Sequence, residues 1–216
     1  MNSDWHQILE STKFKDEHLW TVSRKLKSDL IEFFSGKGLR KAVEVSGWHG
    51  YTTRILSFLF RNVVYVEAPE VFADCSKIAK SVNRDRENID YIPLDAYRDP
   101  WQFEEIDVFF IDCEHRYEPT CSDIDNALGC LATGGYLVFD DYSYPEDAFG
   151  VRRAIDDACR TGKIRVITFI GSRLLWSSES AFSIDASGLP EGVICQKLEP
   201  QQRLGKNDGI HRIEIH

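Results

Sequence analysis

The chain has 216 residues, a length that predicts one domain built around a single sizeable core. It carries 35 acidic and 26 basic residues, and the resulting net charge of -9 argues against a nucleic-acid backbone as a partner. No apolar run reaches the roughly 18 residues of a membrane-spanning helix. Because the six cysteines show no CxxC pair or other zinc spacing, we expect reduced thiols in a cytoplasmic protein with no membrane association.

The first part of the chain predicts one amphipathic helix. Residues 1–16 are polar and show no period, whereas residues 18–36 repeat apolar side chains at three- and four-residue steps and end at a glycine. An alternation of strands and helices follows. We expect strands at 41–45, 63–68, 90–94, 106–112 and 134–141, and helices at 51–60, 70–82, 119–131 and 150–162. Apolar strands separated by helices are typical of an α/β fold with a parallel sheet covered on both faces.

The last two predicted strands, 164–170 and 173–178, are joined only by Gly171 and Ser172. This link is too short for a parallel crossover, so we expect an antiparallel hairpin. Residues 179–216 hold short apolar fragments without a period. We therefore divide the chain into an N-terminal helical segment at 1–39, a sheet domain at 40–178 and a C-terminal extension at 179–216.

Acidic residues stand at or near the carboxyl end of every predicted parallel strand. In an open α/β sheet, ligands bind beyond these ends, near the point where the strand order reverses. A rim of this charge repels phosphate groups, so we expect a cation, a group of hydroxyls, or both. The acidic residues are Glu44, Glu67, Asp95, Asp112, Asp140 and Asp141.

The stretch AVEVSGWHGYTT, residues 42–53, predicts a strand, a glycine-bearing loop and the start of a helix. It matches neither GxGxxG nor GxxxxGK[ST], the two glycine patterns that cradle phosphates. Glu67 follows Glu44 by one helix and one strand, and an acid at the tip of a second strand is the usual partner of two ribose hydroxyls. These features together predict a nucleoside ligand without phosphates.

Five short motifs carry a resemblance to a known family. They are EVSGWHGYTT at 44–53, VEA at 66–68, LDA at 94–96, FIDCEH at 110–115 and GGYLVFDD at 134–141. In this order they resemble the class I S-adenosylmethionine-dependent methyltransferases, and more narrowly the metal-dependent O-methyltransferases typified by catechol O-methyltransferase and by small bacterial enzymes that act on sugars and natural products. The resemblance covers about residues 40–178. It implies a Rossmann-like methyltransferase fold, with a seven-stranded, mostly parallel sheet, an antiparallel terminal hairpin and helices on both faces.

The resemblance also implies site residues. Residues 44–52 would cradle the methionine part of S-adenosylmethionine, Glu67 would hold the ribose, and Asp95 with Ala96 would border the adenine. The full implied cofactor set is Glu44, Ser46, Gly47, Gly50, Tyr51, Thr52, Glu67, Asp95, Ala96 and Asp112. The family has a glycine where Ser46 stands, and a serine costs on the order of 1 kcal/mol if its backbone takes a positive φ.

The resemblance further implies a divalent cation, with magnesium as the first candidate, on Asp112, Asp140 and Asp141. The general base would be His115, with Glu114 as a weaker candidate, and imidazole chemistry suits this task. The acceptor would be a small molecule with a hydroxyl group. A homo-oligomer is compatible with the sequence.

Simpler interpretations of the same residues stay open. Asp140 or Asp141 would cap a turn while Asp112 bonds loop amides, and His115 would be an orienting or merely exposed side chain. At the level of the whole chain, one alternative is a degenerate methyltransferase-like domain that binds ligand without catalysis. Another is a metal-dependent hydrolase, which would leave Glu67 and the first loop unexplained.

Overall fold

The computed structural model describes residues 3–12, 22–144, 148–172, 174–177, 180–185 and 189–199. Its helices are α1 (Ser3–Ser11), α3 (Arg24–Phe34), α4 (Tyr51–Leu59), α5 (Pro69–Val82), α6 (Tyr117–Cys130) and α7 (Gly150–Arg160). Its strands are β1 (Lys41–Val45), β2 (Asn62–Glu67), β3 (Ile89–Pro93), β4 (Ile106–Ile111), β5 (Leu131–Phe139), β6 (Ile164–Ile170), β7 (Leu174–Ser177), β8 (Ser180–Asp185) and β9 (Gly192–Lys197). None of the helices in these ranges is long and apolar enough to cross a membrane.

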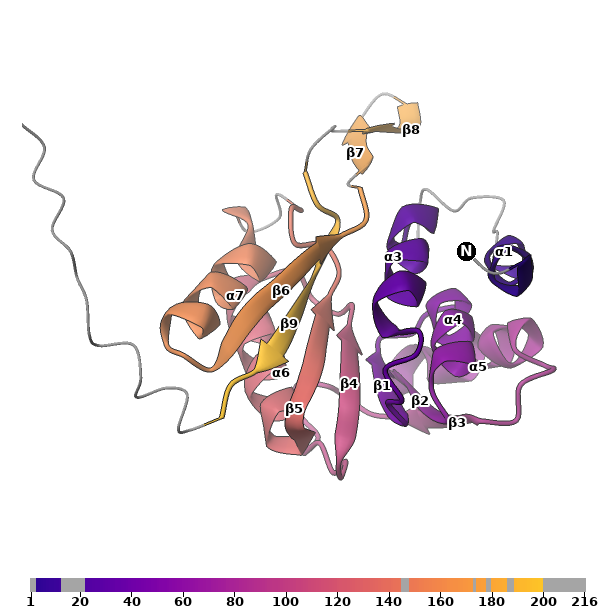
Figure 1. Ribbon diagram of the computed structural model, residues 1–216, viewed down its shortest axis with the longest axis horizontal. Helices are drawn as coiled ribbons and strands as arrows, with labels where there is room; N and C mark the ends of the chain where they lie inside the picture. Colours follow the sequence, from indigo (N-terminus) through magenta and orange to yellow (C-terminus); the bar gives the residue numbers. More distant parts are fainter. Residues whose placement is uncertain are drawn as a thin grey trace, which may run out of the picture.

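Seven strands form the main sheet, in the order β3-β2-β1-β4-β5-β9-β6 (Figure 1). Strands β1 to β5 pair in parallel, and β9 pairs antiparallel with both β5 and β6. The predicted fold class, a Rossmann-like sheet with an antiparallel element at one end, is confirmed. The order reverses between β1 and β4, which is where an open α/β sheet forms its ligand crevice.

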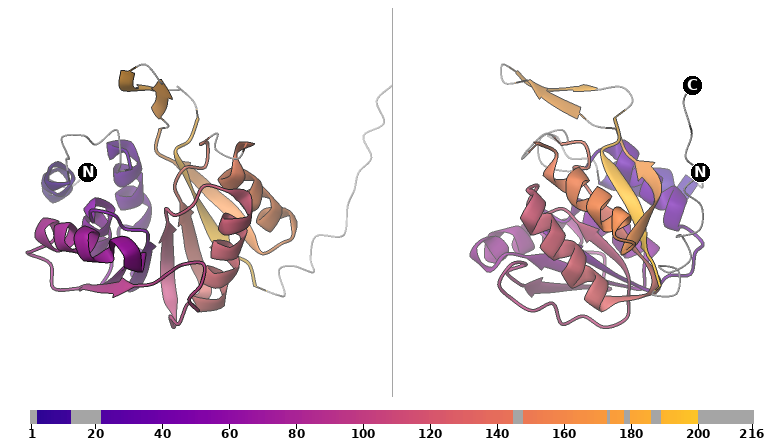
Figure 2. Two further views of the ribbon diagram at one scale, coloured as in Figure 1. Left: turned by 180° about the vertical axis from the view of Figure 1, so that it is seen from behind. Right: turned by 90° about the vertical axis from the view of Figure 1, so that its left-hand side faces the viewer.

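Helices cover both faces of this sheet (Figures 1 and 2), because successive strand residues point to opposite sides. Phe109 of β4 packs in a core with α6 and α7, and its neighbour Phe110 packs in a second core with α3 and α4. Ile124 of α6 lies in the first core, and Trp101, only 9% exposed, packs there as well. Both cores therefore hold the sheet in place from the two sides.

The predicted terminal hairpin is wrong in its pairing. β6 pairs with β9 rather than with β7, and β7 pairs with β8 in a separate two-stranded sheet that extends beyond the main sheet (Figure 2). The physical reason is burial: Val193, Ile194 and Cys195 of β9 are fully buried between the two cores. A two-residue link permits a local hairpin, but the distant strand buries apolar side chains on both faces.

The N-terminal prediction needs two corrections. Residues 3–11 form α1, although the sequence shows no period there, and Leu9 of this helix packs against Ile31 and Ile55. The next helix begins at Arg24, later than expected. Its N-cap is Ser23, whose Oγ accepts a hydrogen bond of 3.1 Å from the Leu26 N–H, and this cap defines the start. Residue 18 of the predicted helix lies outside the described residues.

The parallel ladder continues past the ends of the strands. The Ser46 N–H donates to the Val66 carbonyl at 2.9 Å, the Asp112 N–H to Val45 at 3.2 Å, and the Asp140 N–H to Ile111 at 3.2 Å. These bonds hold the residues that follow β1, β4 and β5 side by side at one edge. The acidic rim predicted from the sequence is therefore a contiguous feature of the fold.

The place of β9 in the core can be tested by truncating one side chain. Ile194→Ala should lower the free energy of unfolding by about 2–4 kcal/mol, because a fully buried isoleucine leaves a cavity. The matched control is Ile167→Ala on the neighbouring strand β6, where the side chain is 38% exposed and the loss should be under about 1 kcal/mol. Urea unfolding measures both, and equal losses would contradict this pairing.

Candidate functional site

The loop after β1 is built around a buried carboxyl group. Glu44 is 2% exposed, and its Oε2 accepts a short hydrogen bond from the Thr53 hydroxyl of α4. Burial, with smaller contributions from Asp112 and Glu67, raises the pKa of Glu44 to about 8. Gly47 is required beside it, because a Cβ at this position would lie 2.5 Å from the Tyr65 ring.

Ser46 adopts a left-handed backbone, with φ at 66°. This is the conformation for which the related family uses glycine, so the strain considered from the sequence is present. The backbone of Ser46 and Gly47 is nevertheless held firmly, because both N–H groups donate to the Val66 carbonyl, at 2.9 and 3.1 Å. The serine therefore carries a conformational cost within a loop that two backbone hydrogen bonds hold in place.

Glu67 lies at the tip of β2 and reaches across to the first loop. It is 5% exposed; its Oε2 accepts from the Trp48 N–H at 2.9 Å, and its Oε1 accepts from the Ala68 N–H at 3.0 Å. Burial raises the pKa of Glu67, and the two backbone hydrogen bonds oppose that rise. A carboxylate oxygen has two lone pairs, so each oxygen can accept one further hydrogen bond.

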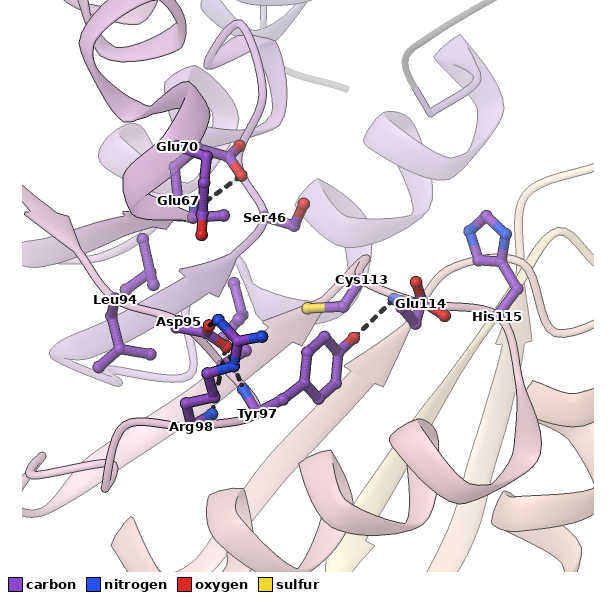
Figure 3. Close-up of a pocket in the computed structure, with 14 residues that line it drawn as sticks. Ser46, Glu67, Glu70, Leu94, Asp95, Tyr97, Arg98, Cys113, Glu114 and His115 are labelled. Atoms are coloured by element: carbon purple, nitrogen blue, oxygen red, sulfur yellow. Dashed lines mark hydrogen bonds and ion pairs between the residues drawn. The ribbon is translucent and has the colours of Figure 1, made fainter.

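A cavity of about 520 Å³ opens beside Glu67, at the carboxyl ends of β1, β2, β3 and β4. In Figure 3, Glu67 lies on one side of this cavity and His115 on the opposite side, with Cys113 and Tyr97 between them. The Asp95 carboxylate accepts from the backbone N–H groups of Tyr97 and Arg98 at 3.0 and 3.2 Å. Its oxygens therefore stabilise the turn that forms one wall.

The remaining residues of the predicted cofactor set lie at the start of α4 and in the cavity wall. Gly50 takes φ of 77° as the N-cap of α4, and Tyr51 and Thr52 begin the helix. A Cβ at Gly50 would lie 2.7 Å from Ala79, so the loop packs closely on α5. Ala96 lines the cavity, as the resemblance implied. Of the predicted cofactor set, four residues line the cavity, namely Ser46, Glu67, Asp95 and Ala96, whereas Glu44, Gly47, Gly50, Tyr51, Thr52 and Asp112 are not among its lining residues.

A cluster of possible metal ligands includes His115, which lines the cavity. One ligand atom each of Asp112, His115 and Asp141 lies within 4.8 Å of the others. The His115 Nε2 is 2.9 Å from the Asp141 Oδ2. Asp140, the third member of the predicted set, is not in this group; it is 9% exposed, and its Oδ1 has no hydrogen-bond partner. Within the described residues, the structure gathers two predicted ligands with the predicted base.

Burial dominates the electrostatics of this cluster, and mutual repulsion adds to it. Burial first, and then the negative charge of Asp141, raise the pKa of Asp112 to about 7. Burial and the charges of Asp141 and Asp112 raise the pKa of Asp140 well above its usual range. Carboxylates this close together either bind protons or need a cation to offset the repulsion between their charged forms.

His115 is held by its surroundings. Its ring lies 5.0 Å from the Tyr144 ring in an edge-on arrangement, and Gly150 at the start of α7 packs on its backbone. A Cβ at Gly150 would lie 2.4 Å from the His115 carbonyl oxygen. Glu114, the weaker candidate for the base, instead forms an exposed ion pair of 2.6 Å with Arg116. The geometry therefore favours His115 over Glu114 as a group that can act on a bound molecule.

Sequence reasoning missed Glu191 and Tyr97. Glu191 belongs to the segment for which no element was predicted, and it lies close enough to Asp112 and Asp140 to raise the pKa of each. Tyr97 forms part of the cavity wall, and its hydroxyl accepts from the Glu114 N–H at 3.1 Å. In the sequence, only its position two residues after Asp95 could have indicated that Tyr97 lies at the site.

The buried carboxyl of Glu44 predicts a pH-dependent stability. Its folded-state pKa of about 8 exceeds the usual value of 4.5, so the folded protein retains a proton that the unfolded chain releases. Stability is therefore greatest below about pH 4.5 and falls as the pH rises through 8. Glu44→Gln should make this fall smaller, because other buried carboxyl groups still contribute to it, and should be more stable than the parent by more than about 1 kcal/mol at pH 9.

Urea unfolding at pH 5 and pH 9 measures the effect. Glu70→Gln is the matched control, since it makes the same change at an exposed carboxyl in the first turn of α5. If the free energy of unfolding falls with pH as steeply in Glu44→Gln as in the parent, this carboxyl is ionised in the folded protein at neutral pH.

Comparisons with known proteins agree with this geometry. Residues 43–142, just under half of the chain, match the family model of a methyltransferase domain. An uncharacterised protein of Acanthamoeba polyphaga mimivirus is 46% identical over 37 residues, a match that spans only 17% of this chain and 17% of that protein.

Three solved structures show the fold. A putative O-methyltransferase of Klebsiella pneumoniae is 13% identical, with a TM-score of 0.62, over 92% of this chain and 91% of that one. An O-methyltransferase of Bacillus cereus in complex with S-adenosylhomocysteine is 16% identical, with a TM-score of 0.57, over 92% of each chain. The N-methyltransferase NodS of Bradyrhizobium japonicum, in complex with the same ligand, is 15% identical, with a TM-score of 0.60, over 92% of this chain and 100% of that one. Residues 43–142 are therefore similar to a methyltransferase domain, and the chain has the fold of the S-adenosylmethionine-dependent methyltransferases of known structure.

Proposed function

We propose that the protein is an S-adenosylmethionine-dependent methyltransferase that uses a divalent cation to methylate a hydroxyl group of a small molecule. The observation that carries this proposal is the pairing of two different sites in one crevice. A nucleoside-sized cavity lies against Glu67, and the group of Asp112, His115 and Asp141 lies at its other side. A methyl donor in the first site would face an acceptor held in the second.

The cavity residues suit the parts of a sulfonium nucleoside. The free lone pairs of Glu67 can accept both ribose hydroxyls, while its bonds to the Trp48 and Ala68 N–H groups hold the carboxylate in place. Leu94, Ala96 and Cys113 offer apolar surface for a base. Ser46, two residues after the buried Glu44 that Thr53 fixes, lines the cavity, and we assign this end to the methionine part.

The acidic cluster fits a divalent cation. The Asp140 Oδ1 is buried without a partner, and the carboxyl groups of Asp112 and Asp140 are strongly destabilised in their charged forms. Carboxylate oxygens are the ligands that magnesium and manganese prefer, and manganese also accepts an imidazole nitrogen. We assign the cation to Asp112 and Asp141, with Asp140 beside them; such an ion lowers the pKa of a bound hydroxyl and orients it.

The chain's own residues would then handle the acceptor proton. The His115 Nε2 donates to the Asp141 carboxylate at 2.9 Å, so the other ring nitrogen would accept the proton of the acceptor hydroxyl, and the Asp141 carboxylate would stabilise the resulting imidazolium. Tyr144 and the backbone around Gly150 hold the ring in position. Orientation by these contacts supplies part of the rate, because both reactants are held in one crevice.

The degenerate binding domain remains the second candidate, because Ser46 adopts the strained backbone for which the related enzymes use glycine. A binder and an enzyme both retain S-adenosylhomocysteine, and only the enzyme transfers methyl groups from S-adenosylmethionine to a panel of diols in the presence of magnesium. Transfer to amines alone would show that the methyl acceptor is a nitrogen atom and not an oxygen atom. Binding without any transfer would favour the degenerate domain.

The ribose assignment is tested at Glu67. Glu67→Gln should weaken S-adenosylhomocysteine binding by about 1.5–3 kcal/mol, because a charged hydrogen-bond acceptor is lost. Isothermal titration calorimetry measures the affinity, and circular dichroism checks that the variant is folded. The control is Asp90→Asn, which neutralises an exposed carboxylate on β3 and should leave the affinity unchanged. Equal affinity of Glu67→Gln and the parent would remove the ribose assignment.

The base assignment is tested at His115. His115→Ala should lower turnover by roughly 10²- to 10⁴-fold, the usual contribution of a positioned base, and its activity should recover as rising pH ionises the acceptor hydroxyl. Glu114→Gln should retain turnover, because this carboxylate is paired with Arg116 at the surface. Turnover at the parent's rate in His115→Ala would exclude the base role.

A further inference from the structure

Glu191 joins three segments that are far apart in the sequence. It directly precedes β9, and its backbone carbonyl accepts a hydrogen bond of 2.8 Å from the Tyr142 N–H. Tyr142 immediately follows Asp141, so this bond fixes the loop that carries the acidic residues after β5. The position of the Asp141 loop thus depends on a residue from the C-terminal part of the chain.

The side chain of Glu191 bonds to Ser23 rather than to the Asp141 loop. Its Oε1 accepts from the Ser23 N–H at 2.6 Å, and its Oε2 accepts a short hydrogen bond from the Ser23 hydroxyl. Ser23 is the N-cap of α3. Both carboxylate oxygens therefore have a partner outside the acidic cluster, which distinguishes Glu191 from a residue poised to coordinate an ion directly.

Close packing fixes this carboxylate. A Cβ at Gly171, at the end of β6, would lie 2.4 Å from the Glu191 Oε2, so only glycine leaves room there. A Cβ at Gly192 would lie 2.5 Å from the Phe139 carbonyl oxygen, which brings the start of β9 against the end of β5. The carboxylate consequently has little freedom to move away from its neighbours.

The charge of Glu191 acts on the acidic cluster. It lies near enough to Asp112 and Asp140 to raise the pKa of both, and burial together with the charge of Asp141 raises the pKa of Glu191 itself to about 7. A bridge that only joined Ser23 to β9 would need no acid, since a glutamine oxygen also accepts hydrogen bonds. A fourth acid beside three others destabilises the free protein and strengthens the attraction for a cation.

We propose that Glu191 is a positioning residue of the cation site: anchored on Ser23, it holds the Asp141 loop through its backbone and adds a negative charge that raises the affinity for a divalent cation. This inference rests on the proposed function, because it assumes a cation on Asp112 and Asp141. Residues that support metal ligands from behind typically change metal affinity by about 10- to 100-fold.

The test measures Mn²⁺ binding by isothermal titration calorimetry, without any turnover. Glu191→Gln keeps a side chain that can bond Ser23 but removes the charge, and it should weaken Mn²⁺ binding by about tenfold. Its affinity for S-adenosylhomocysteine should stay within about twofold, because the cavity is not lined by Glu191. Asp29→Asn is the matched control: its carboxylate also ties α3 to the sheet, through a 2.9 Å bond from the Gly171 N–H, but should leave Mn²⁺ binding unchanged.

Ser23→Ala provides a second variant that leaves the charge in place. It removes one of the two bonds that anchor the carboxylate and should weaken Mn²⁺ binding by a smaller factor, about threefold. Mn²⁺ affinity unchanged in Glu191→Gln would overturn the inference, and so would a loss of about 1,000-fold or more, which would make Glu191 a direct ligand. A parent protein that binds S-adenosylhomocysteine but no Mn²⁺ would overturn the cation part of the proposed function and the role of Glu191 with it.

Discussion

The hydrogen-bond ladder of the parallel sheet continues beyond the strands, and the candidate site depends on this continuation. The N–H groups of Ser46, Asp112 and Asp140 each bond to a carbonyl at the end of the neighbouring strand. The loops after β1, β4 and β5 are thereby fixed side by side before any side chain contributes. A crevice at the point where strand order reverses follows from this backbone arrangement.

The continuation of the hydrogen-bond ladder beyond the strands also creates an electrostatic problem. By bringing strand tips together, the ladder also brings together carboxyl groups that repel one another, and burial raises the cost further. The apolar cores on both faces of the sheet supply the stability that offsets this cost. A buried cluster of this kind is suited to bind an external cation, and the protein loses stability by maintaining it.

Local patterns in the sequence predicted most of the parallel part of the fold. Apolar runs such as IDVFFID and the helical stripe around Ile124 identify their elements and even the faces that they bury, because these signals are local. The partner of β6 was predicted wrongly, since the choice between β7 and β9 depends on burial between two cores that no local window contains. α1 was missed for a similar reason: its contact through Leu9 involves residues of α3 and α4.

The candidate site could likewise be predicted only where the positions of its residues follow from local patterns or from the fold class. Residues at strand tips, such as Glu67 and Asp112, could be named because the fold class predicts where the tips meet. Glu191 could not be named, because its place beside the cluster results from the insertion of β9 between β5 and β6. The grouping of His115 with Asp112 and Asp141 depends on the packing of Gly150 against the loop after β4, a close contact between backbones that residue spacing does not predict.

The most direct test of the account is a crystal structure of the protein with Mn²⁺ and S-adenosylhomocysteine, with the ion located by its anomalous scattering. The account predicts an anomalous peak within coordination distance of the Asp112 and Asp141 carboxylates, and a nucleoside in the cavity with its ribose hydroxyls on Glu67. A peak at another location, or a nucleoside bound away from Glu67, would contradict the proposal that one crevice holds both the methyl donor and the cation.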